Sequence, residues 1–478
     1  MQHFSLKRKD LLLLSFSLLM SVSCVEIDDG LQRENNPVND WIKDYMDVVY
    51  LWNTQIPAKT DKTLFPADYF GTLLYKTEDR FSFIAEDYAE LSDLLNGVQM
   101  EAGYDFTLFR VDPVSENVVG LINYIKPHSP ASFADLRRGD IFFTVNGKQL
   151  TLSNYQQLVG EMSAAHDLGV QRNNATLSIK LTVARYEENP VLLDSVYTID
   201  GKKIAYLIFN FFSTDKGDNS YTYLKELNEI FGKYKQFPVD ELILDLRYNG
   251  GGMVSVATAL ASMISNRTSS DLFSIEEYNS IVDKELKKEY GNDYNKTFFD
   301  DDLIIQDDAG KVISQSPLNK LTGLERLYVL TSSRTASASE MLINGLRTYM
   351  TVVLVGEKTY GKNVGMWFIY EQDAQKQKSN RWGMLPIVVR MCNSKNQSDY
   401  THGFEVDTET DEYAVMPLLP LGDTHEPLLE AAFAHIGVQK AGSVRSAEEK
   451  LDFLPLMSSI NRTPVRENMT IKKQIISR

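Results

Sequence analysis

Small hydroxyl and methyl side chains stand directly before an apolar periodic run in the stretch RTASASEMLINGLR, residues 334–347. An apolar, strand-like run at 327–331 precedes this stretch, so the sequence predicts a strand-to-helix turn around Ser337. Amides in the first turn of a helix lack internal partners, and the helix dipole favours negative charge there. Ser337 is therefore expected on a positive electrostatic patch. The spacing of Ser337 and Glu340 also fits a capping box, in which the hydroxyl only satisfies a backbone amide.

Two further loops follow apolar strand-like runs. The stretch ELILDLRYNGGG ends in three glycines at 250–252, and glycine allows positive φ and a close backbone approach to a bound atom. The stretch TVVLVGEKTYGKNVG places Lys362 in a glycine-containing loop. Each loop alone could be a tight turn. Open α/β sheets carry their sites at the carboxyl ends of the strands, so we expect the three loops to meet there.

Together the three loops resemble the C-terminal processing, or tail-specific, serine peptidases of family S41. TASASE is similar to the family pattern S-A-S-A-S-E, which implies that Ser337 is the nucleophile. The glycine-lysine loop implies Lys362 as the base, 25 residues later, which is the family's usual spacing. DLRYNGGG resembles the motif D-L-R-x-N-x-G-G, which implies an oxyanion hole from the amides of Gly251, with Gly252 as the alternative, and Ala338.

The reaction that this resemblance implies is acyl transfer by a Ser-Lys dyad, with polypeptide as the substrate and no metal or organic cofactor. Serine is a weak nucleophile at its own pKa, so a neighbouring base must accept its proton. A lysine can do so only when neutral, and burial and the positive end of a helix both lower a lysine pKa from about 10.4. Each oxyanion-hole amide is worth about 3–4 kcal/mol.

One residue departs from the family pattern. Many members carry glutamine four residues after the catalytic lysine, and here that position is Met366, whose thioether cannot replace an amide. Either another polar group, such as Asn363, orients Lys362, or activity is reduced. The main alternative is thus a catalytically weak or inactive peptide-binding surface lipoprotein of the same fold. A Ser-His variant using His402 or His425 is a third possibility, against which the lysine spacing argues.

The periodicity along the chain predicts a multidomain α/β protein. Strand and helix patterns alternate over 186–437, which is typical of an α/β domain with largely parallel strands. The family resemblance implies a ClpP/crotonase-like peptidase core there, preceded by an N-terminal helical region at 38–97. A polar insertion at 266–320 is expected to form a surface excursion. The C-terminal extension, 438–478, has weak periodicity and is expected to be partly disordered.

The segment 98–185 has short β-type runs separated by turns. Its stretch KPHSPASFADLRRGDIFFTVNGKQL resembles a PDZ domain, a fold that binds an extended or C-terminal peptide as an added strand. The resemblance implies a carboxylate-binding loop at Gly103, Tyr104, Asp105 and Phe106. An inward-pointing Asp105 would be unfavourable beside a bound carboxylate, so a PDZ domain that serves only as a scaffold is the alternative.

The N-terminus has the features of an export signal. A basic cluster, an apolar run and small residues up to Cys24 predict a signal peptide at 1–23, since a membrane-spanning helix needs about 20 apolar residues. The residues around Cys24 resemble a bacterial lipobox, with Ser21 where leucine is preferred, and the acidic residues that follow resemble the signal of Bacteroidetes surface lipoproteins. This implies a lipidated Cys24, a tether at 24–37 and anchoring in the cell envelope, in the outer membrane at its periplasmic or surface face.

Composition narrows the classes of partner. The chain is 43% hydrophobic with a formal net charge of −16, and no dense Lys/Arg cluster follows the signal, so nucleic acid is not expected as a partner. The membrane is expected as a partner only through the lipid anchor. The six histidines lack metal-ligand spacing, so no metal site is expected. After lipidation only Cys392 remains, which excludes an intramolecular disulfide.

Overall fold

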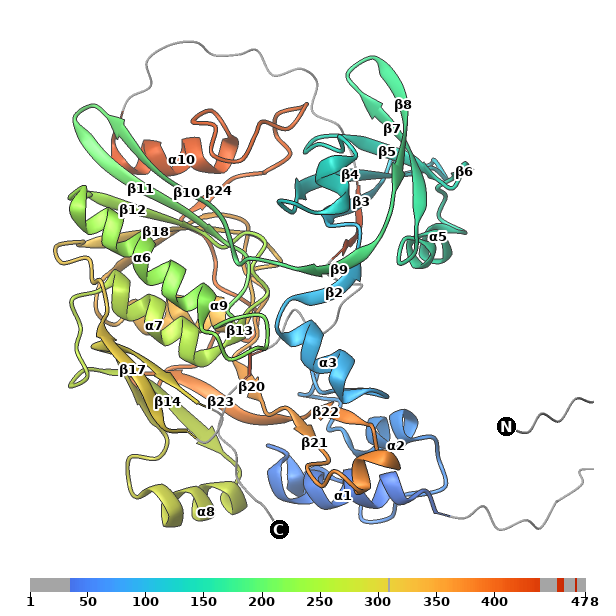
Figure 1. The fold of residues 1–478 in the computed structure, drawn as a ribbon, viewed down its shortest axis with the longest axis vertical. Helices are drawn as coiled ribbons and strands as arrows, with labels where there is room; N and C mark the ends of the chain where they lie inside the picture. Colours follow the sequence, from blue (N-terminus) through green and yellow to red (C-terminus); the bar gives the residue numbers. More distant parts are fainter. Residues whose placement is uncertain (1–34, 308–309, 439–453, 460–468, 471–478) are drawn as a thin grey trace, which may run out of the picture.

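The computed structural model describes residues 35–307, 310–438, 454–459 and 469–470 (Figure 1). The predicted signal peptide and Cys24 lie outside the described residues, as does the tether except for its last three positions. No helix in the described ranges combines the length and apolar character that crossing a bilayer requires.

The N-terminal region is mainly helical. Asn36 caps the first helix through its side chain, Pro37 occupies the first turn, and Ile42, Met46 and Val49 are buried along one face. The elements are α1 (Pro37–Val49), η1 (Asn53–Gln55), α2 (Pro66–Leu73), β1 (Phe83–Ala85) and α3 (Tyr88–Leu95). This region packs against the main core of the molecule.

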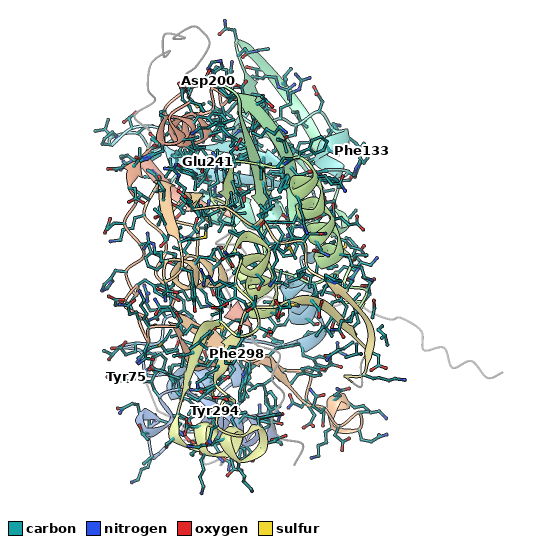
Figure 2. The ribbon with its side chains drawn as sticks, turned by 90° about the vertical axis from the view of Figure 1, so that its left-hand side faces the viewer. Tyr75, Phe133, Asp200, Glu241, Tyr294 and Phe298 are labelled. Carbon is teal, nitrogen blue, oxygen red and sulfur yellow. The ribbon has the colours of Figure 1, made fainter. Side chains whose placement is uncertain are left out.

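The segment predicted to be PDZ-like holds a β-rich unit with its own hydrophobic core. Its sheet has the order β25-β3-β4-β5-β7-β8, with β6 beside β5, and every pair in it is antiparallel. The elements are β2 (Val98–Glu101), β3 (Tyr104–Arg110), β4 (Val118–Ile125), α4 (Pro130–Phe133), β5 (Ile141–Val145), β6 (Lys148–Gln149), α5 (Tyr155–Glu161), β7 (His166–Arg172), β8 (Ala175–Leu181) and β9 (Ala184–Glu187). Figure 2 shows Phe133 of this unit and Tyr294 of the 266–320 segment toward opposite ends of the molecule.

A six-stranded mixed sheet forms the centre, in the order β10-β11-β12-β18-β19-β24. Only the β10–β11 pair is antiparallel; the other four pairs are parallel. The strands are β10 (Val191–Ile199), β11 (Lys202–Phe209), β12 (Glu241–Asp245), β18 (Arg326–Thr331), β19 (Thr351–Gly356) and β24 (Thr408–Glu409). The helices are α6 (Thr222–Gln236), α7 (Val254–Ile264), α9 (Ala338–Leu346) and α10 (Pro427–Ile436).

Helices cover both faces of this central sheet (Figure 1). In β18, Leu327 and Val329 pack into the same cluster as α6, α7 and α9, whereas Tyr328 and Leu330 pack with α10. Side chains alternate between the two faces of a strand, so a strand covered on both faces reads as a continuous apolar run. That burial explains why RLYVLT carries no polar alternation.

A second six-stranded sheet has the order β13-β26-β20-β23-β14-β15. Its strands are β13 (Gly252–Met253), β26 (Met469–Thr470), β20 (Val364–Met366), β23 (Ile387–Asn393), β14 (Leu272–Tyr278) and β15 (Lys296–Phe298). The remaining elements are α8 (Ser280–Tyr290), β16 (Asp302–Gln306), β17 (Val312–Pro317), β21 (Ile369–Tyr370), η2 (Lys376–Lys378) and β22 (Gly383–Leu385). The expectation that 266–320 is only a surface excursion is wrong in part, because β14 lies inside this sheet and its Phe273 is fully buried.

The C-terminal extension, which was expected to be partly disordered, contains two strands, β25 (Leu454–Ser458) beside β3 and β26 between β13 and β20. Both strands are short and pair with strands that come much earlier in the chain. Apart from these two strands, Val438 and Ser459, the extension lies outside the described residues.

Candidate active site

Three loops leave the carboxyl ends of adjacent parallel strands. β12 leads into the glycine loop, β18 into the Ser337 loop and β19 into the Lys362 loop, and β18 pairs with both of the others. The loops are also tied together by hydrogen bonds: Thr335 Oγ1 donates to Leu246 O at 2.8 Å, and Tyr360 N donates to Thr335 O at 3.0 Å. The sheet therefore brings together the three sequence elements that were expected to form one site.

Ser337 occupies the residue before α9 in an unusual backbone conformation, with φ 64° and ψ −115°. A non-glycine residue in such a region costs about 1–3 kcal/mol and is typical of functional sites. The side chain is fully buried, and its Oγ has no hydrogen bond of ordinary geometry within the described part of the chain. Buried hydroxyls are normally satisfied. The capping role that the sequence left open thus lacks its hydroxyl bond, although Ser337 and Glu340 are placed as in a capping box.

Glu340 joins the Ser337 loop to the Lys362 loop. Its Oε2 accepts from the backbone amides of Ser337 at 2.9 Å and of Lys362 at 2.8 Å. Its Oε1 accepts from Thr359 Oγ1 at 2.6 Å and from Gly361 N at 2.7 Å. Burial raises the pKa of Glu340, and these four donors oppose that rise. From the sequence, Glu340 was considered only as the capping partner of Ser337. Its position inside the TASASE motif was the one sequence feature that could have pointed to a further role in the site.

Lys362 is fully buried. Its Nζ lies 3.8 Å from Met366 Sδ and 4.8 Å from the centre of the Phe81 ring. The thioether thus stands where the family glutamine would reach the amine, and sulfur is a weak acceptor. Asn363, the residue expected to take over that role, instead donates to Ser398 O at 2.6 Å.

The N-terminal region contacts the Lys362 loop. These contacts were not predicted from the sequence. Arg80 Nη2 donates to Gly361 O at 2.8 Å and to Thr401 O at 3.0 Å. Phe81 comes next in the chain and supplies the ring over the Lys362 amine. The region therefore covers one side of the site and holds the base loop in place.

The predicted oxyanion donors lie at the mouths of two helices. Ala338 is the first residue of α9, where amides have no intrahelical partner. Gly251 has φ +116°, and its amide donates to Asn249 Oδ1 at 2.8 Å, so this amide is engaged in the present structure. The neighbouring Gly252, with φ +136°, is the alternative that the sequence left open. Asn249 also holds the Ser337 loop, since its carbonyl accepts from Ser339 Oγ at 3.1 Å.

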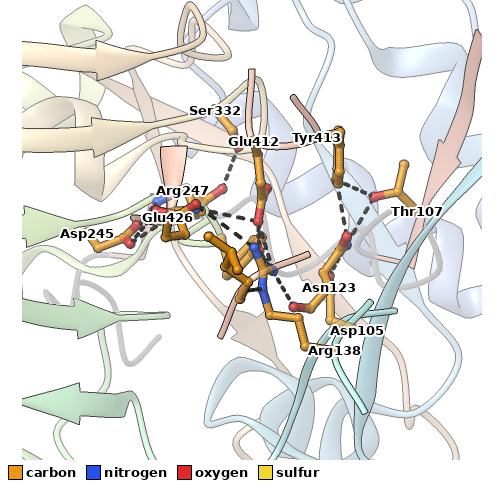
Figure 3. A network of polar contacts seen from close by, with 12 residues as sticks. Asp105, Thr107, Asn123, Arg138, Asp245, Arg247, Ser332, Glu412, Tyr413 and Glu426 are labelled. Atoms are coloured by element: carbon orange, nitrogen blue, oxygen red, sulfur yellow. Dashed lines mark hydrogen bonds and ion pairs between the residues drawn. The ribbon is translucent and has the colours of Figure 1, made fainter. Parts of the chain in front are cut away.

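A buried charge network lies beneath the glycine loop (Figure 3). Arg247 is fully buried, with ion pairs at 2.8 Å to Asp245 and 2.5 Å to Glu426. Arg138 of the β-rich unit pairs with Glu412 at 3.0 Å and donates to the hydroxyl of Tyr248 at 2.8 Å. The network therefore connects the β-rich unit to the strand end that carries the glycine loop.

The four residues predicted as a PDZ carboxylate-binding loop lie at the start of β3. The Gly103 carbonyl accepts from Ser129 Oγ at 3.0 Å, and Tyr104 OH lies 2.8 Å from His166 Nε2. The Phe106 side chain is fully buried in the β-rich core. None of these interactions reaches Ser337 directly.

Asp105 does link the β-rich unit to the catalytic loop. Its Oδ1 accepts from Arg334 Nη1 at 2.8 Å, and Arg334 stands three residues before Ser337. Asn123 Nδ2 donates to the same carboxylate oxygen at 2.6 Å. The charge of Asp105, unfavourable beside a carboxylate-binding loop, is thus compensated by Arg334.

Metal ligation is not indicated by the described residues, among which no group of three or more histidine, cysteine or acidic side chains is placed to hold an ion. His402, a candidate for a Ser-His arrangement, is exposed, whereas Ser337 is fully buried. Cys392 is a free, buried cysteine in β23, and burial raises the pKa of its thiol to about 11.

Two family descriptions match the sequence. The model of peptidase family S41 matches residues 203–389, and that of the peptidase S41 N-terminal domain matches residues 37–83. The first match contains all three loops of the site, and the second contains Arg80 and Phe81.

Individual relatives are also similar to this chain. The chloroplastic C-terminal processing peptidase of Tetradesmus obliquus is 27% identical over 50% of this chain and 47% of its own length. The carboxyl-terminal-processing protease of a Picosynechococcus species is 23% identical over 64% of this chain and 65% of its own length. This chain thus spans about half to two thirds of the length of these relatives. A crystal structure described as an S41 protease of Bacteroides fragilis has a TM-score of 0.64 and 25% identity, over 83% of this chain and 97% of that one.

Proposed function

We propose that the chain is a member of peptidase family S41, whose models match residues 37–83 and 203–389, and that it is a serine endopeptidase that cleaves polypeptides with a dyad of Ser337 and Lys362. The observation that carries this proposal is the shared carboxylate oxygen. Glu340 Oε2 accepts from the amides of both residues, so the two backbones lie within two hydrogen bonds of each other. Both side chains are fully buried, and the Ser337 hydroxyl lacks a hydrogen bond among the described residues.

In the proposed reaction, Ser337 Oγ attacks the carbonyl carbon of the scissile peptide bond while Lys362 Nζ takes its proton. The oxyanion is stabilised by the Ala338 amide and by a glycine-loop amide, either Gly252 or a Gly251 released from Asn249. The protonated lysine then gives its proton to the leaving amine, which leaves an ester on Ser337. Water activated by Lys362 hydrolyses that ester and restores the hydroxyl. The proposed step requires Lys362 to be neutral when it takes the proton.

The other parts of the chain fit this assignment. We propose that the β-rich unit is a PDZ domain that takes an extended or C-terminal segment of the substrate along β3. We also propose a ClpP/crotonase-like fold for the peptidase core that contains the central sheet, export of the chain, and lipidation at Cys24 that holds the enzyme in the cell envelope. The substrate is proposed as polypeptide in an extended or unfolded state, because an added strand requires free backbone groups.

Covalent labelling tests whether Ser337 is the nucleophile. A fluorophosphonate reagent, which phosphonylates activated serines with loss of fluoride, is expected to add once per chain, and peptide mapping should place the adduct on Ser337. The Ser337→Ala variant should remain unmodified, whereas Ser333→Ala, which changes an exposed serine in the same loop, should be modified like the wild type. An adduct on another serine, or equal modification of the Ser337→Ala variant, would remove Ser337 from the mechanism.

A second function, peptide binding with little or no turnover, is favoured by one observation. Met366 Sδ is 3.8 Å from the Lys362 amine, where an amide oxygen would hold it more firmly. We expect Met366→Gln to raise kcat about tenfold or more, since one hydrogen bond to a charged group contributes about 1.5–3 kcal/mol. Steady-state cleavage of an unfolded polypeptide measures this, with Met366→Leu as the control that keeps the volume without an acceptor. Unchanged kcat in Met366→Gln would mean that the amine needs no acceptor at this position.

A further inference from the structure

The C-terminal segment of the chain pairs with two distinct parts of the molecule. β25 adds to the outer edge of β3 in the β-rich unit, and β26 lies between β13 and β20 in the second sheet. Nine residues, 460–468, separate the described ends of the two strands. One stretch of chain thus reaches both the proposed peptide-docking edge and the strands that follow two of the catalytic loops.

β25 docks as an added antiparallel strand. Its register pairs Ser458 with Thr107, Met457 with Leu108 and Leu454 with Arg110, with a bulge at Leu456. β3 pairs with β4 on its other side, so β25 occupies the edge that β3 would otherwise leave open. Met457 packs against the core of the β-rich unit, whereas Leu456 is exposed. Adding a strand to an open sheet edge is a recurring mode of peptide recognition.

The docked strand also contacts the nucleophile loop. Arg334 Nη1 donates to Ser458 Oγ at 3.2 Å and to Asp105 Oδ1 at 2.8 Å. The Phe106 amide donates to Ser459 Oγ at 3.2 Å. The end of β25 therefore lies between the predicted carboxylate-binding loop and the residue three positions before Ser337.

β26 lies beside two strands that follow loops of the candidate site. It pairs in parallel with β13, Gly252 opposite Met469 and Met253 opposite Thr470, and its Thr470 is also opposite Met366 in β20. β13 begins directly after Gly251, and β20 ends four residues after Lys362. In the sheet order, β26 is the strand that joins β13 to β20. A segment in this position pairs with the backbone of β13, which follows the glycine loop, and with that of β20, which follows Lys362.

We propose that β25 and β26 are intramolecular occupants of the peptide channel, docked on β3 and between β13 and β20, which must leave before another polypeptide can enter. This inference rests on the proposed function for the identity of the channel. The same two edges then define how an external substrate binds: an extended segment that adds to β3 at one end and fills the β13–β20 gap at the other.

The size of the effect follows from tethering. A linked segment has an effective concentration of about 1 mM, so an intrinsic affinity of about 0.1 mM would leave roughly one channel in ten open. Releasing the segment is therefore expected to raise the rate of cleavage of an added polypeptide by about tenfold, at low substrate concentration.

The kinetic arm of the test uses two substitutions in the same strand. Met457→Asp places a charge against the β-rich core and should release β25, giving about tenfold higher kcat/KM toward an unfolded protein substrate. Leu456→Asp places the same charge on the exposed side and should leave kcat/KM unchanged. Equal values for wild type and both variants would overturn the proposal.

The binding arm does not depend on catalysis. A fluorescein-labelled synthetic peptide with the sequence of residues 454–470 is added to a Ser337→Ala chain shortened to end at Val438, with circular dichroism as the check of folding. Saturable anisotropy is expected with the shortened chain and little with the full-length Ser337→Ala chain, whose own segment fills the channel. Saturable binding by the full-length Met457→Asp, Ser337→Ala chain gives the same result if the shortened chain does not fold.

The results of these experiments distinguish the proposed peptidase activity from the proposed intramolecular occupant. Peptide binding to the opened chains together with absent cleavage in every variant would contradict the proposed peptidase activity and support the cis occupant. Cleavage by the wild type at the same rate as Met457→Asp, with no peptide binding to either opened chain, would leave the activity standing and overturn the occupant.

Discussion

Replacing Lys362 by methionine is expected to lower kcat on an unfolded polypeptide about a thousandfold, because a positioned general base contributes about 10²–10⁴ in rate. Methionine keeps most of the side-chain volume in a fully buried site next to Met366 and Phe81, so the variant should stay folded. The measurement is kcat at saturating substrate, with the thermal unfolding midpoint recorded for the same preparation. A loss of kcat with an unchanged midpoint assigns the effect to chemistry.

The controls come from the same loop and the same dyad. Lys358→Met changes an exposed lysine that pairs with Glu405, and its kcat should equal that of the wild type. The double variant Ser337→Ala, Lys362→Met should be no slower than Ser337→Ala alone, because residues that act as one unit are strongly non-additive. Losses that multiply in the double variant would show that Ser337 and Lys362 do not act in one step.

The sequence predicted those parts of the site that depend on hydrophobic periodicity and on local motifs. Apolar runs that end in glycine or small residues identified β12, β18 and β19, and parallel strands bring such ends to one edge. Ser337 and Lys362 were named from their motifs, and the structure places both in adjacent loops that share Glu340. Their chemical roles stay predictions until they are tested as described above.

The parts that sequence reasoning missed depend on contacts between distant segments. Arg334 pairs with Asp105, which lies 229 positions away, and Arg80 reaches the carbonyl of Gly361 across 281 positions. No local pattern encodes such pairs, because either partner alone resembles an ordinary surface charge. The same holds for β25 and β26, which are too short to show a strand period and form only because β3, β13 and β20 offer open edges.

The polar insertion at 266–320 shows that amino-acid composition can also mislead a sequence-based prediction. In β14, whose sequence is LFSIEEY, the polar residues gave the run the composition of a surface segment, although Phe273, Ser274 and Glu276 are buried. Buried and partly buried positions do not alternate along this strand, so a period-two count over residues 272–278 would not have found it either. The strand follows from its pairing with β15 and with β23, which is distant in the sequence.

Arg247→Met is expected to lower the free energy of unfolding by about 3–5 kcal/mol, the typical cost of removing one partner of a buried ion pair. Arg247 has no exposed side-chain surface, and its loss leaves Asp245 and Glu426 buried without their cation. Chemical denaturation at neutral pH measures the change. Arg326→Met removes a half-exposed arginine that pairs with Glu241 at 3.3 Å, and this surface control should lose less than about 1 kcal/mol.

The loss of unfolding free energy in Arg247→Met should also depend on pH. The direction of this pH dependence identifies the cause of the loss. Burial raises the pKa of Asp245 even with Arg247 beside it, and removing the cation should raise that pKa further. A carboxyl group with a folded-state pKa above its unfolded value keeps a proton that the unfolded chain has lost, so stability falls as pH rises between the two values. The variant should therefore be closer to the wild type at pH 5 than at pH 8. A deficit that is constant across this range would point to lost packing around Arg247, and not to the stranded carboxylates.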